Sequence, residues 1–191
     1  FIPLHIWLPH AHPAAPSHIS AVLSGVMIKM GIYGLMRTIL IIKNFPEWCA
    51  VTLLLIGMIS GIGGVLYALG QHEIKKLLAY HSIENIGIIT LGLGIGLWGQ
   101  IAHHELAALI GYAGALLHVF NHAVFKGLLF LSAGSLIRST GTGEIDHLGG
   151  LLKRLPWTGH LFLVGSLAIC GLPLFNGFVS EWLVYRALFE G

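Results

Sequence analysis

The chain has 191 residues, of which 55% are apolar and only 9% charged, and its mean hydropathy is +0.83. A soluble domain carries about 25% charged residues, so this composition excludes an ordinary water-soluble protein and predicts a multi-pass integral membrane protein surrounded by a lipid bilayer. The formal charge of +2, without a basic cluster interleaved with aromatic residues, argues against a nucleic-acid partner.

The chain begins with a short apolar segment, residues 1–8, that is expected to be the tail of a truncated hydrophobic helix. Because the sequence starts inside this segment and without Met, it favours a fragment of a longer protein. Proline removes a backbone donor and disfavours helical geometry in the residue before it. Pro9, Pro13 and Pro16 follow in close succession, so no regular helix is expected before about Ser17.

Long apolar runs predict an all-α helix bundle with about five full spans and a partial one, forming a single transmembrane domain over 1–191. Crossing a bilayer takes about 20 apolar residues. The spans are expected at 17–42, 48–70, 77–99, 105–137 and 159–190.

The last span, 159–190, is expected to be a broken helix. Gly171, Pro173 and Gly177 fall in its middle, and the backbone groups that proline frees need protein or water partners at that depth. Interrupted helices of this kind mark ion and substrate sites in transporters, although a kink that only serves packing is the alternative. Glu181 follows the break, either as a proton-exchanging carboxylate or as a simple charge at a helix start.

Positive charges are unevenly divided between the two sides of the predicted bundle. One side carries two basic residues and the other carries five. The two are Arg37 and Lys43; the five are Lys75, Lys76, Arg138, Lys153 and Arg154. The positive-inside rule therefore places the loops around 71–76 and 138–158 on the cytoplasmic side. Lys75 and Lys76 are expected to set orientation and contact lipid headgroups, and 139–158 is expected to be a partly ordered surface loop.

Ionisable side chains inside the predicted spans are the candidate functional residues, because such groups are costly in lipid and usually face a pathway. Lys29 lies midway along 17–42, where it is either a proton-relaying amine or a structural partner of a carboxylate in another subunit. His118, His122 and Lys126 follow one another at a spacing of four residues, which places them on one face of a helix. Two imidazoles and an amine in a row favour a proton relay.

Other polar residues are weaker candidates. Tyr112 and Asn121 add polar character near the row, with either a relay or a structural role. Four histidines crowd the proline-rich entry segment, and solvated or relay roles are favoured there over a metal site. They are His5, His10, His12 and His18.

Redox cofactor motifs are absent from the sequence. Cys49 and Cys170 belong to no CxxC pair, and no GxGxxG, P-loop or CxxCH motif occurs. A b-type haem held by His118 or His122 together with a histidine from another span is an alternative, although these two, one turn apart on one helix, cannot be both axial ligands of one haem, and Lys126 beside them fits a haem edge poorly. The sequence therefore predicts no metal site or cofactor in this chain.

Five motifs resemble the antiporter-like membrane subunits shared by respiratory complex I, group 4 membrane-bound hydrogenases and Mrp-type cation/proton antiporters. The motifs are PLHIWLPHAHPAAPSH, GVMIKMGIYGLMR, HEIKKLLAYHSIENIG, LLHVFNHAVFKGLLFLSAG and GLPLFNGFVSEWL. The resemblance runs over essentially the whole chain. PHAHPAAPSH and LFNGFVSEW are most similar to the large membrane subunits of hydrogenase-4 and formate hydrogenlyase.

The resemblance implies a larger inverted-repeat bundle in which residues 1–8 would be the second half of one broken helix and 159–190 another. Lys29 would be the central relay lysine, and Glu181 the terminal exchange residue. Between them, the row on 105–137 would lead toward the second half-channel. Trp7 would match the tryptophan beside the first broken helix. The glutamate–lysine pair of the family would lie upstream of residue 1.

In function, the resemblance implies a non-catalytic pumping subunit that moves protons or Na⁺ in a redox-driven complex, in the cytoplasmic (inner) membrane of a prokaryote. Expected partners are other membrane subunits and a peripheral redox arm, which would hold iron–sulfur clusters and a NiFe centre or flavin. The alternatives are a subunit of an NADH–quinone oxidoreductase or an Mrp-type antiporter. A passive scaffold that anchors a hydrogenase arm is a further alternative.

Overall fold

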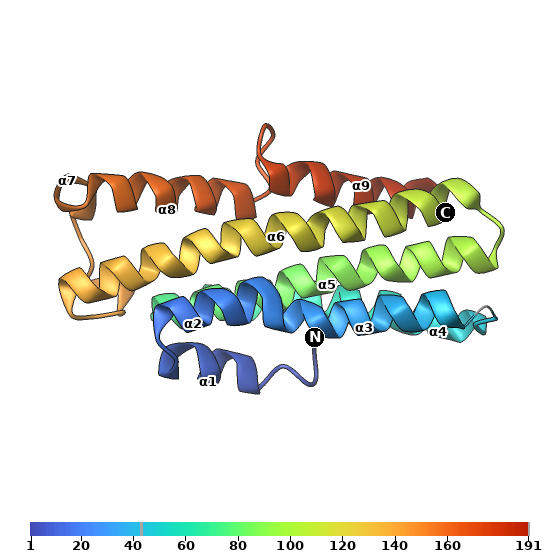
Figure 1. Ribbon diagram of the computed structural model, residues 1–191, viewed down its shortest axis with the longest axis horizontal. Helices are drawn as coiled ribbons and strands as arrows, with labels where there is room; N and C mark the ends of the chain where they lie inside the picture. Colours follow the sequence, from blue (N-terminus) through green and yellow to red (C-terminus); the bar gives the residue numbers. More distant parts are fainter. Residues whose placement is uncertain (43, 191) are drawn as a thin grey trace.

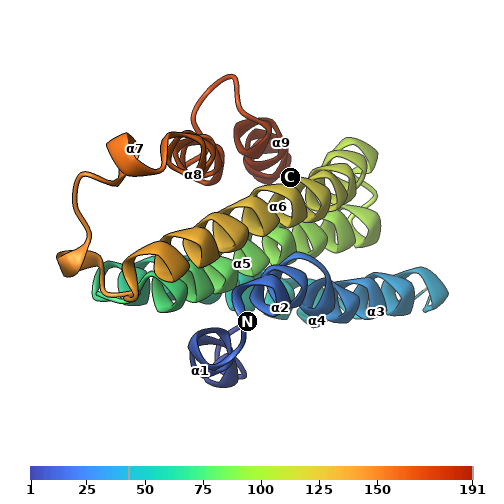
Figure 2. The same ribbon diagram turned by 60° about the vertical axis from the view of Figure 1, so that its left-hand side comes forward.

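Long helices lying side by side along one axis make up the computed structural model, which describes residues 1–42 and 44–190 (Figure 1). At the centre are α5 (Ile74–Ile101) and α6 (Glu105–Thr140), which pack against each other. The helix α4 (Glu47–Leu69) covers α5, and the C-terminal helices lie along α6 on the opposite side (Figure 2). The predicted all-α bundle is confirmed.

The first predicted span is helical over its whole length but changes character in its middle. It consists of α2 (Ser17–Val22), a π-helical turn η1 (Leu23–Met27) and α3 (Ile28–Ile41). A π turn widens the helix locally, and such turns are frequent at functional sites. Here the turn directly precedes Lys29, the second residue of α3.

The entry segment differs from the prediction, because a short helix, α1 (Trp7–Ala14), forms there despite its prolines. Pro9 lies in the first turn, where amide groups have no intrahelical acceptor, and Pro13 lies in the last turn. The helix ends at Ala15, whose ψ of 148° is the extended geometry expected before Pro16. The helical segment is thus 7–14, while residues 2–6 form turns, so the expectation of a helical half at 1–8 is wrong.

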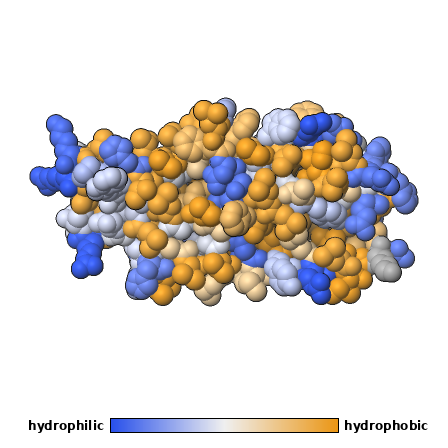
Figure 3. Space-filling model, turned by 45° about the horizontal axis from the view of Figure 1, so that its top comes forward, coloured by the Kyte–Doolittle hydropathy of each residue, from blue (hydrophilic) through white to orange (hydrophobic). Residues whose placement is uncertain are grey.

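Within the part of the chain that the structure describes, four helical segments are long and apolar enough to cross a membrane: 17–41, 47–69, 74–101 and 105–140. Each matches a predicted span to within a few residues. The helix α5 is the most enclosed, whereas the outer helices present apolar side chains at the surface. On the face drawn in Figure 3, apolar atoms dominate the middle and hydrophilic atoms gather mainly at the two ends, as expected of a protein that lies across a bilayer.

The C-terminal region contains the predicted break. Two half-helices, α8 (Pro156–Ile169) and α9 (Asn176–Glu190), follow each other along α6, each only about 21–23 Å long by the helical rise. Between them Gly171 has a φ of +61° and Leu174 a φ of +81°, and Pro173 lies in the same connection. Gly177 lies inside the first turn of α9 rather than in the break. The fifth span is therefore a pair of half-helices.

The two loops predicted to share a side meet at one end of the bundle. The Ile74 amide donates to the Gly143 carbonyl at 3.0 Å, and the Ile145 amide donates to the His72 carbonyl at 2.8 Å. Beyond Gly143, the loop contains the 3-10 turn η2 (Ile145–His147) and the short helix α7 (Leu151–Arg154). The loop 139–158 is therefore anchored to the start of α5.

The prediction that Lys75 contacts headgroups is wrong. Its side chain is buried, and its amine donates to the Ala15 carbonyl at the end of α1, over 2.8 Å. Lys43, which entered the charge count, lies outside the described residues.

Glycine contacts bring α4 and α5 close together. A Cβ atom on Gly87 would lie 2.5 Å from the Gly61 amide nitrogen and 2.7 Å from the Gly57 carbonyl oxygen. Small residues of this kind let helix backbones approach closely inside membranes. This packing holds α5 in place behind the polar residues described next.

Candidate functional site

A row of buried polar side chains occupies the middle of α6, between two apolar clusters of the core. His118, His122 and Lys126 all have no exposed surface. One apolar cluster lies around Phe130 and the other around Ala115. The predicted spacing thus places the three groups on one inward face of α6.

His118 is held at both ring nitrogens. Its Nε2 is 3.0 Å from Oδ1 of Asn85 on α5, and its Nδ1 is 2.9 Å from Oγ of Ser180 on α9. The Asn85 side-chain amide donates to the His81 carbonyl at 2.8 Å, which leaves Oδ1 as an acceptor. His118 therefore donates from Nε2, and Nδ1 is the position at which a further proton can be taken up or released.

His122, in contrast, has no hydrogen-bond partner at either ring nitrogen within the described part of the chain. Its ring centroid lies 6.2 Å from that of His118 and 5.3 Å from the edge-on ring of Phe125. Buried polar atoms of this kind are normally satisfied by ordered water. The imidazole is thus suited to exchange protons with water between His118 and Lys126.

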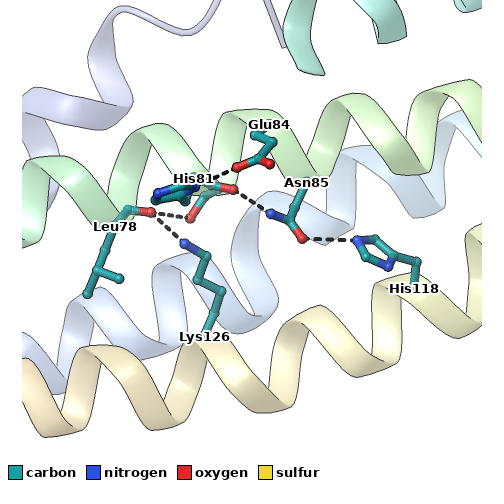
Figure 4. Close-up of polar contacts among 7 residues, drawn as sticks. Leu78, His81, Glu84, Asn85, His118 and Lys126 are labelled. Atoms are coloured by element: carbon teal, nitrogen blue, oxygen red, sulfur yellow. Dashed lines mark hydrogen bonds and ion pairs between the residues drawn. The ribbon is translucent and has the colours of Figure 1, made fainter. Parts of the chain in front are cut away.

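Lys126 crosses from α6 to α5. Its amine donates to the Leu78 carbonyl at 2.7 Å and lies 6.0 Å from the centre of the Phe130 ring (Figure 4). In residues 1–42 and 44–190, no carboxylate lies within 4 Å of this amine. A buried amine in this position can exchange a proton with a neighbouring imidazole or water.

A short chain of polar atoms links Lys126 to Lys29. The Lys29 amine donates to the Ser24 carbonyl inside the π turn η1. The Ser24 hydroxyl is 2.8 Å from the Ser82 hydroxyl of α5, which donates at 3.0 Å to the same Leu78 carbonyl that binds Lys126. The two lysines, on α3 and α6, are thus connected through α5.

Glu181 lies on α9, half-buried, on the other side of α5 and α6 from Lys29. Its carboxylate approaches the backbone of Gly171 in the helix break. It lines a pocket of about 360 Å³ together with His81 and Glu84 of α5. The structure thus brings Glu181 to the helix break, one residue beyond Ser180, which contacts the row.

The weaker candidates divide into two groups. Asn121 joins the network, because its amide donates to the Asn176 carbonyl at 2.8 Å and to Ser180 at 3.1 Å. Tyr112, Trp7 and His18 do not join it: Tyr112 donates to Gln100 at 3.0 Å, while Trp7 and His18 are exposed. A role for these three in the row has no contact to support it.

One entry-segment histidine is deeply buried. The His12 ring stacks on Phe130 with centroids 4.4 Å apart and has no exposed surface. Its neighbours His10 and His18 are exposed. Across the described ranges, no three His, Cys, Asp or Glu side chains gather in a way that could hold a metal ion.

Four polar residues of α5 near the row were not among the predicted site residues. Ser82, Asn85, His81 and Glu84 all lie within the predicted span 77–99. Glu84 and His81 could have been predicted from the sequence, because an ionisable residue inside a span suggests function by default. Ser82 and Asn85 could not, since their role depends on which helix they meet.

The arrangement holds protonatable groups and hydrogen-bonding groups in an interior that is otherwise apolar. Imidazoles and amines can each accept and release one proton, and hydroxyls can pass protons between them. The chemistry that this geometry allows is proton transfer along a buried path, from Lys29 through Lys126 and the histidines toward the helix break.

Sequence comparison gives a family match over the whole chain. Residues 1–191 match the family described as "NADH:quinone oxidoreductase/Mrp antiporter, TM". Hydrogenase-4 component B of Escherichia coli (strain K12) is 48% identical over 192 residues, covering 99% of this chain and 29% of that protein. Formate hydrogenlyase subunit 3 of the same organism is 44% identical over 189 residues, covering 99% of this chain and 31% of that protein.

Structural comparison agrees with this match. A chain of the membrane-bound sulfane sulfur reductase, an archaeal respiratory membrane complex, superposes with a TM-score of 0.87 at 30% identity, over 97% of this chain and 36% of that chain. The present chain therefore spans about a third of the length of these relatives.

Proposed function

Because the chain belongs to the NADH:quinone oxidoreductase/Mrp antiporter family of membrane subunits, we propose that it is part of a proton-translocating subunit of a redox-driven membrane complex. The relatives named hydrogenase-4 component B and formate hydrogenlyase subunit 3 favour a hydrogenase complex of that kind. The chain carries the relay, and the redox chemistry lies in partner subunits.

The observation that carries this proposal is a pair of buried amines, Lys29 and Lys126, that are held at two backbone carbonyls with the hydrogen-bonded hydroxyls of Ser24 and Ser82 between them. Four successive contacts join the two amines through Ser24, Ser82 and the Leu78 carbonyl, all of them buried. A bundle held together only by packing gains little from burying two lysines, since each costs free energy in the bilayer interior. The carbonyls of Ser24 and Leu78 accept hydrogen bonds but cannot donate protons, so proton movement between the amines requires water beside the Ser24 and Ser82 hydroxyls, which can both donate and accept.

The setting of the complex is part of the proposal. Other membrane subunits would flank the exposed apolar surface, and a peripheral arm would hold the iron–sulfur clusters and a NiFe centre or flavin. The membrane would be the cytoplasmic membrane of a prokaryote, with the 71–76 and 139–158 loops on the cytoplasmic side by their positive charge. Proton transport is favoured over Na⁺ transport, because the row on α6 consists of amines and imidazoles, which carry protons, whereas hard cations prefer sites built from several oxygen ligands.

The test is proton uptake coupled to electron transfer by the full parent complex in proteoliposomes, with Lys29→Met. We expect proton uptake per electron to be lost, because Met fills the space of Lys29 without an ionisable group. Lys153→Met, an exposed change on α7, is the matched control and should leave uptake unchanged. Normal uptake by Lys29→Met, with impaired assembly as the sole defect, would instead support the passive-scaffold alternative.

Cation/proton antiport is a second candidate, since the matching family also includes Mrp antiporters. The two functions differ in their driving force. An antiporter would acidify or alkalinise vesicles in response to an imposed Na⁺ gradient without any electron donor. A coupled pump requires the donor.

A further inference from the structure

A histidine–carboxylate pair on α5 has no place in the path described so far. His81 Nδ1 and Glu84 Oε2 lie 2.5 Å apart, and the two side chains are 30% and 20% exposed. Both are well inside the 28-residue span of α5. A carboxylate inside a spanning helix costs free energy that a purely structural helix would avoid, so a functional role is the default expectation.

The pair borders a pocket that it shares with the helix break. The pocket has a volume of about 360 Å³, and His81, Glu84, Glu181 and Tyr185 line it. Liquid water occupies about 30 Å³ per molecule, so several water molecules fit between the pair and Glu181. Three ionisable groups from α5 and α9, with one tyrosine hydroxyl, therefore face one hydratable space.

The same pair lies on α5 one turn beyond the acceptor of Lys126. Leu78, whose carbonyl binds the Lys126 amine, also lines the pocket, one turn before His81 on α5. Figure 4 shows Lys126 extending from α6 to this carbonyl, and His81 bonded to Glu84 farther along α5. Glu84 and Glu181 line this pocket together with Leu78, the acceptor of the Lys126 amine. Glu84 is thus a carboxylate situated between the relay amine and the carboxylate at the break.

We propose that the His81–Glu84 pair is a proton-carrying station between Lys126 and Glu181. This inference rests on the proposed function and adds two residues and a route to it. The Lys126 ammonium gives one proton to neutral His81 at Nε2, which leaves a neutral amine and an imidazolium held by the Glu84 carboxylate. The imidazolium then passes one proton across the pocket to the Glu181 carboxylate, which becomes a carboxylic acid, and His81 is neutral again.

This route differs from the one along α6. His118 contacts the Ser180 hydroxyl, so protons on the histidine row reach α9 at Ser180. The pair on α5 leads instead to the pocket where the Glu181 carboxylate lies. Changing His81 or Glu84 therefore lowers proton uptake if protons take the route through α5. It leaves uptake unchanged if they take only the route along α6.

The test compares variants of the full parent complex in proteoliposomes by protons taken up per electron transferred. His81→Asn keeps a donor to Glu84 but cannot carry an extra proton, and Glu84→Gln removes the carboxylate while keeping the size. Each is expected to lower the ratio by about a hundredfold or more, the smaller end of what a positioned proton carrier contributes. Glu84→Asp, which retains the carboxylate, is expected to restore much of the uptake.

The control is a second histidine–carboxylate pair outside the path. His72 and Asp146 lie 2.8 Å apart at the surface, with 72% and 70% exposure, so Asp146→Asn is expected to leave the ratio unchanged. Lys126→Met is measured in parallel as the test of the relay itself.

The outcomes separate the two proposals. Loss of uptake in Lys126→Met with a normal ratio in His81→Asn and Glu84→Gln would overturn the station and leave the relay standing. Normal uptake in Lys126→Met would overturn both. If one α5 variant does not assemble, the other decides the question. Failure of both to assemble, with Asp146→Asn intact, would make the pair a packing element and overturn the station.

Discussion

Replacing Lys126 with Met is expected to abolish proton transport without making the bundle less stable. The Lys126 side chain has no exposed surface, and among residues 1–42 and 44–190 its amine makes one hydrogen bond, to the Leu78 carbonyl. Met is similar in length, flexible and uncharged, so it fills the same space on α6. The variant therefore separates the chemistry of the amine from the packing of its side chain.

The size of the stability change follows from two opposing terms. A lysine near the middle of a spanning helix costs roughly 2.5–3.5 kcal/mol, and Met removes that cost. The hydrogen bond to Leu78 is lost at the same time, and a polar contact of this kind inside a membrane contributes about 0.6–2 kcal/mol. The difference makes Lys126→Met more stable than the parent by about 0.5–3 kcal/mol.

The assay is thermal unfolding of the detergent-solubilised parent complex, alongside proton uptake by the same preparation in vesicles. Lys153→Met, on the exposed helix α7, is the control and should change neither measurement. A clearly lower unfolding temperature for Lys126→Met, with uptake reduced only in proportion to the folded fraction, would refute the reasoning. It would mean that the amine holds the helices together rather than carrying protons.

Three further predictions concern residues that support the path. Gly87→Ala should prevent normal assembly, because its Cβ would meet the α4 backbone at 2.5 Å, while Gly61→Ala, with nothing within 4 Å, should assemble normally in blue-native gels. Asn85→Leu should lower proton uptake and cost about 1–2 kcal/mol of stability, since it leaves a buried imidazole N–H unpaired; unchanged thermal unfolding would contradict this. Ser24→Ala and Ser82→Ala should each slow uptake, and the double variant should be no slower than either single one, whereas additive losses would show independent roles.

The spans and the α6 row were predictable because both depend on local spacing. Runs of apolar residues give the lengths of α4, α5 and α6 directly. His118, His122 and Lys126 share a face through the helical period alone, whatever packs against it. The break between α8 and α9 was predictable for the same reason, since glycine and proline limit backbone geometry locally.

The contacts that turn the row into a path were not predictable from the sequence. The Leu78 carbonyl is a backbone group, and its role as the acceptor of Lys126 depends on how α5 is placed against α6. Ser180 meets His118 only because α9 docks on α6 after the break. The helix α1 also formed against expectation, because its prolines fall in its first and last turns, where they do least harm.

The π-helical turn η1 makes the role of Lys29 depend on the number of residues in that turn. Each residue in an α-helix advances the chain by about 100°, and the wider turn at Leu23–Met27 alters the phase between α2 and α3. Deleting one residue there would rotate Lys29 away from the Ser24 carbonyl while leaving a segment still long and apolar enough to insert. Deleting one codon here is thus expected to uncouple transport without preventing membrane insertion. Related sequences that lack one residue at this point are expected to have lost coupled transport.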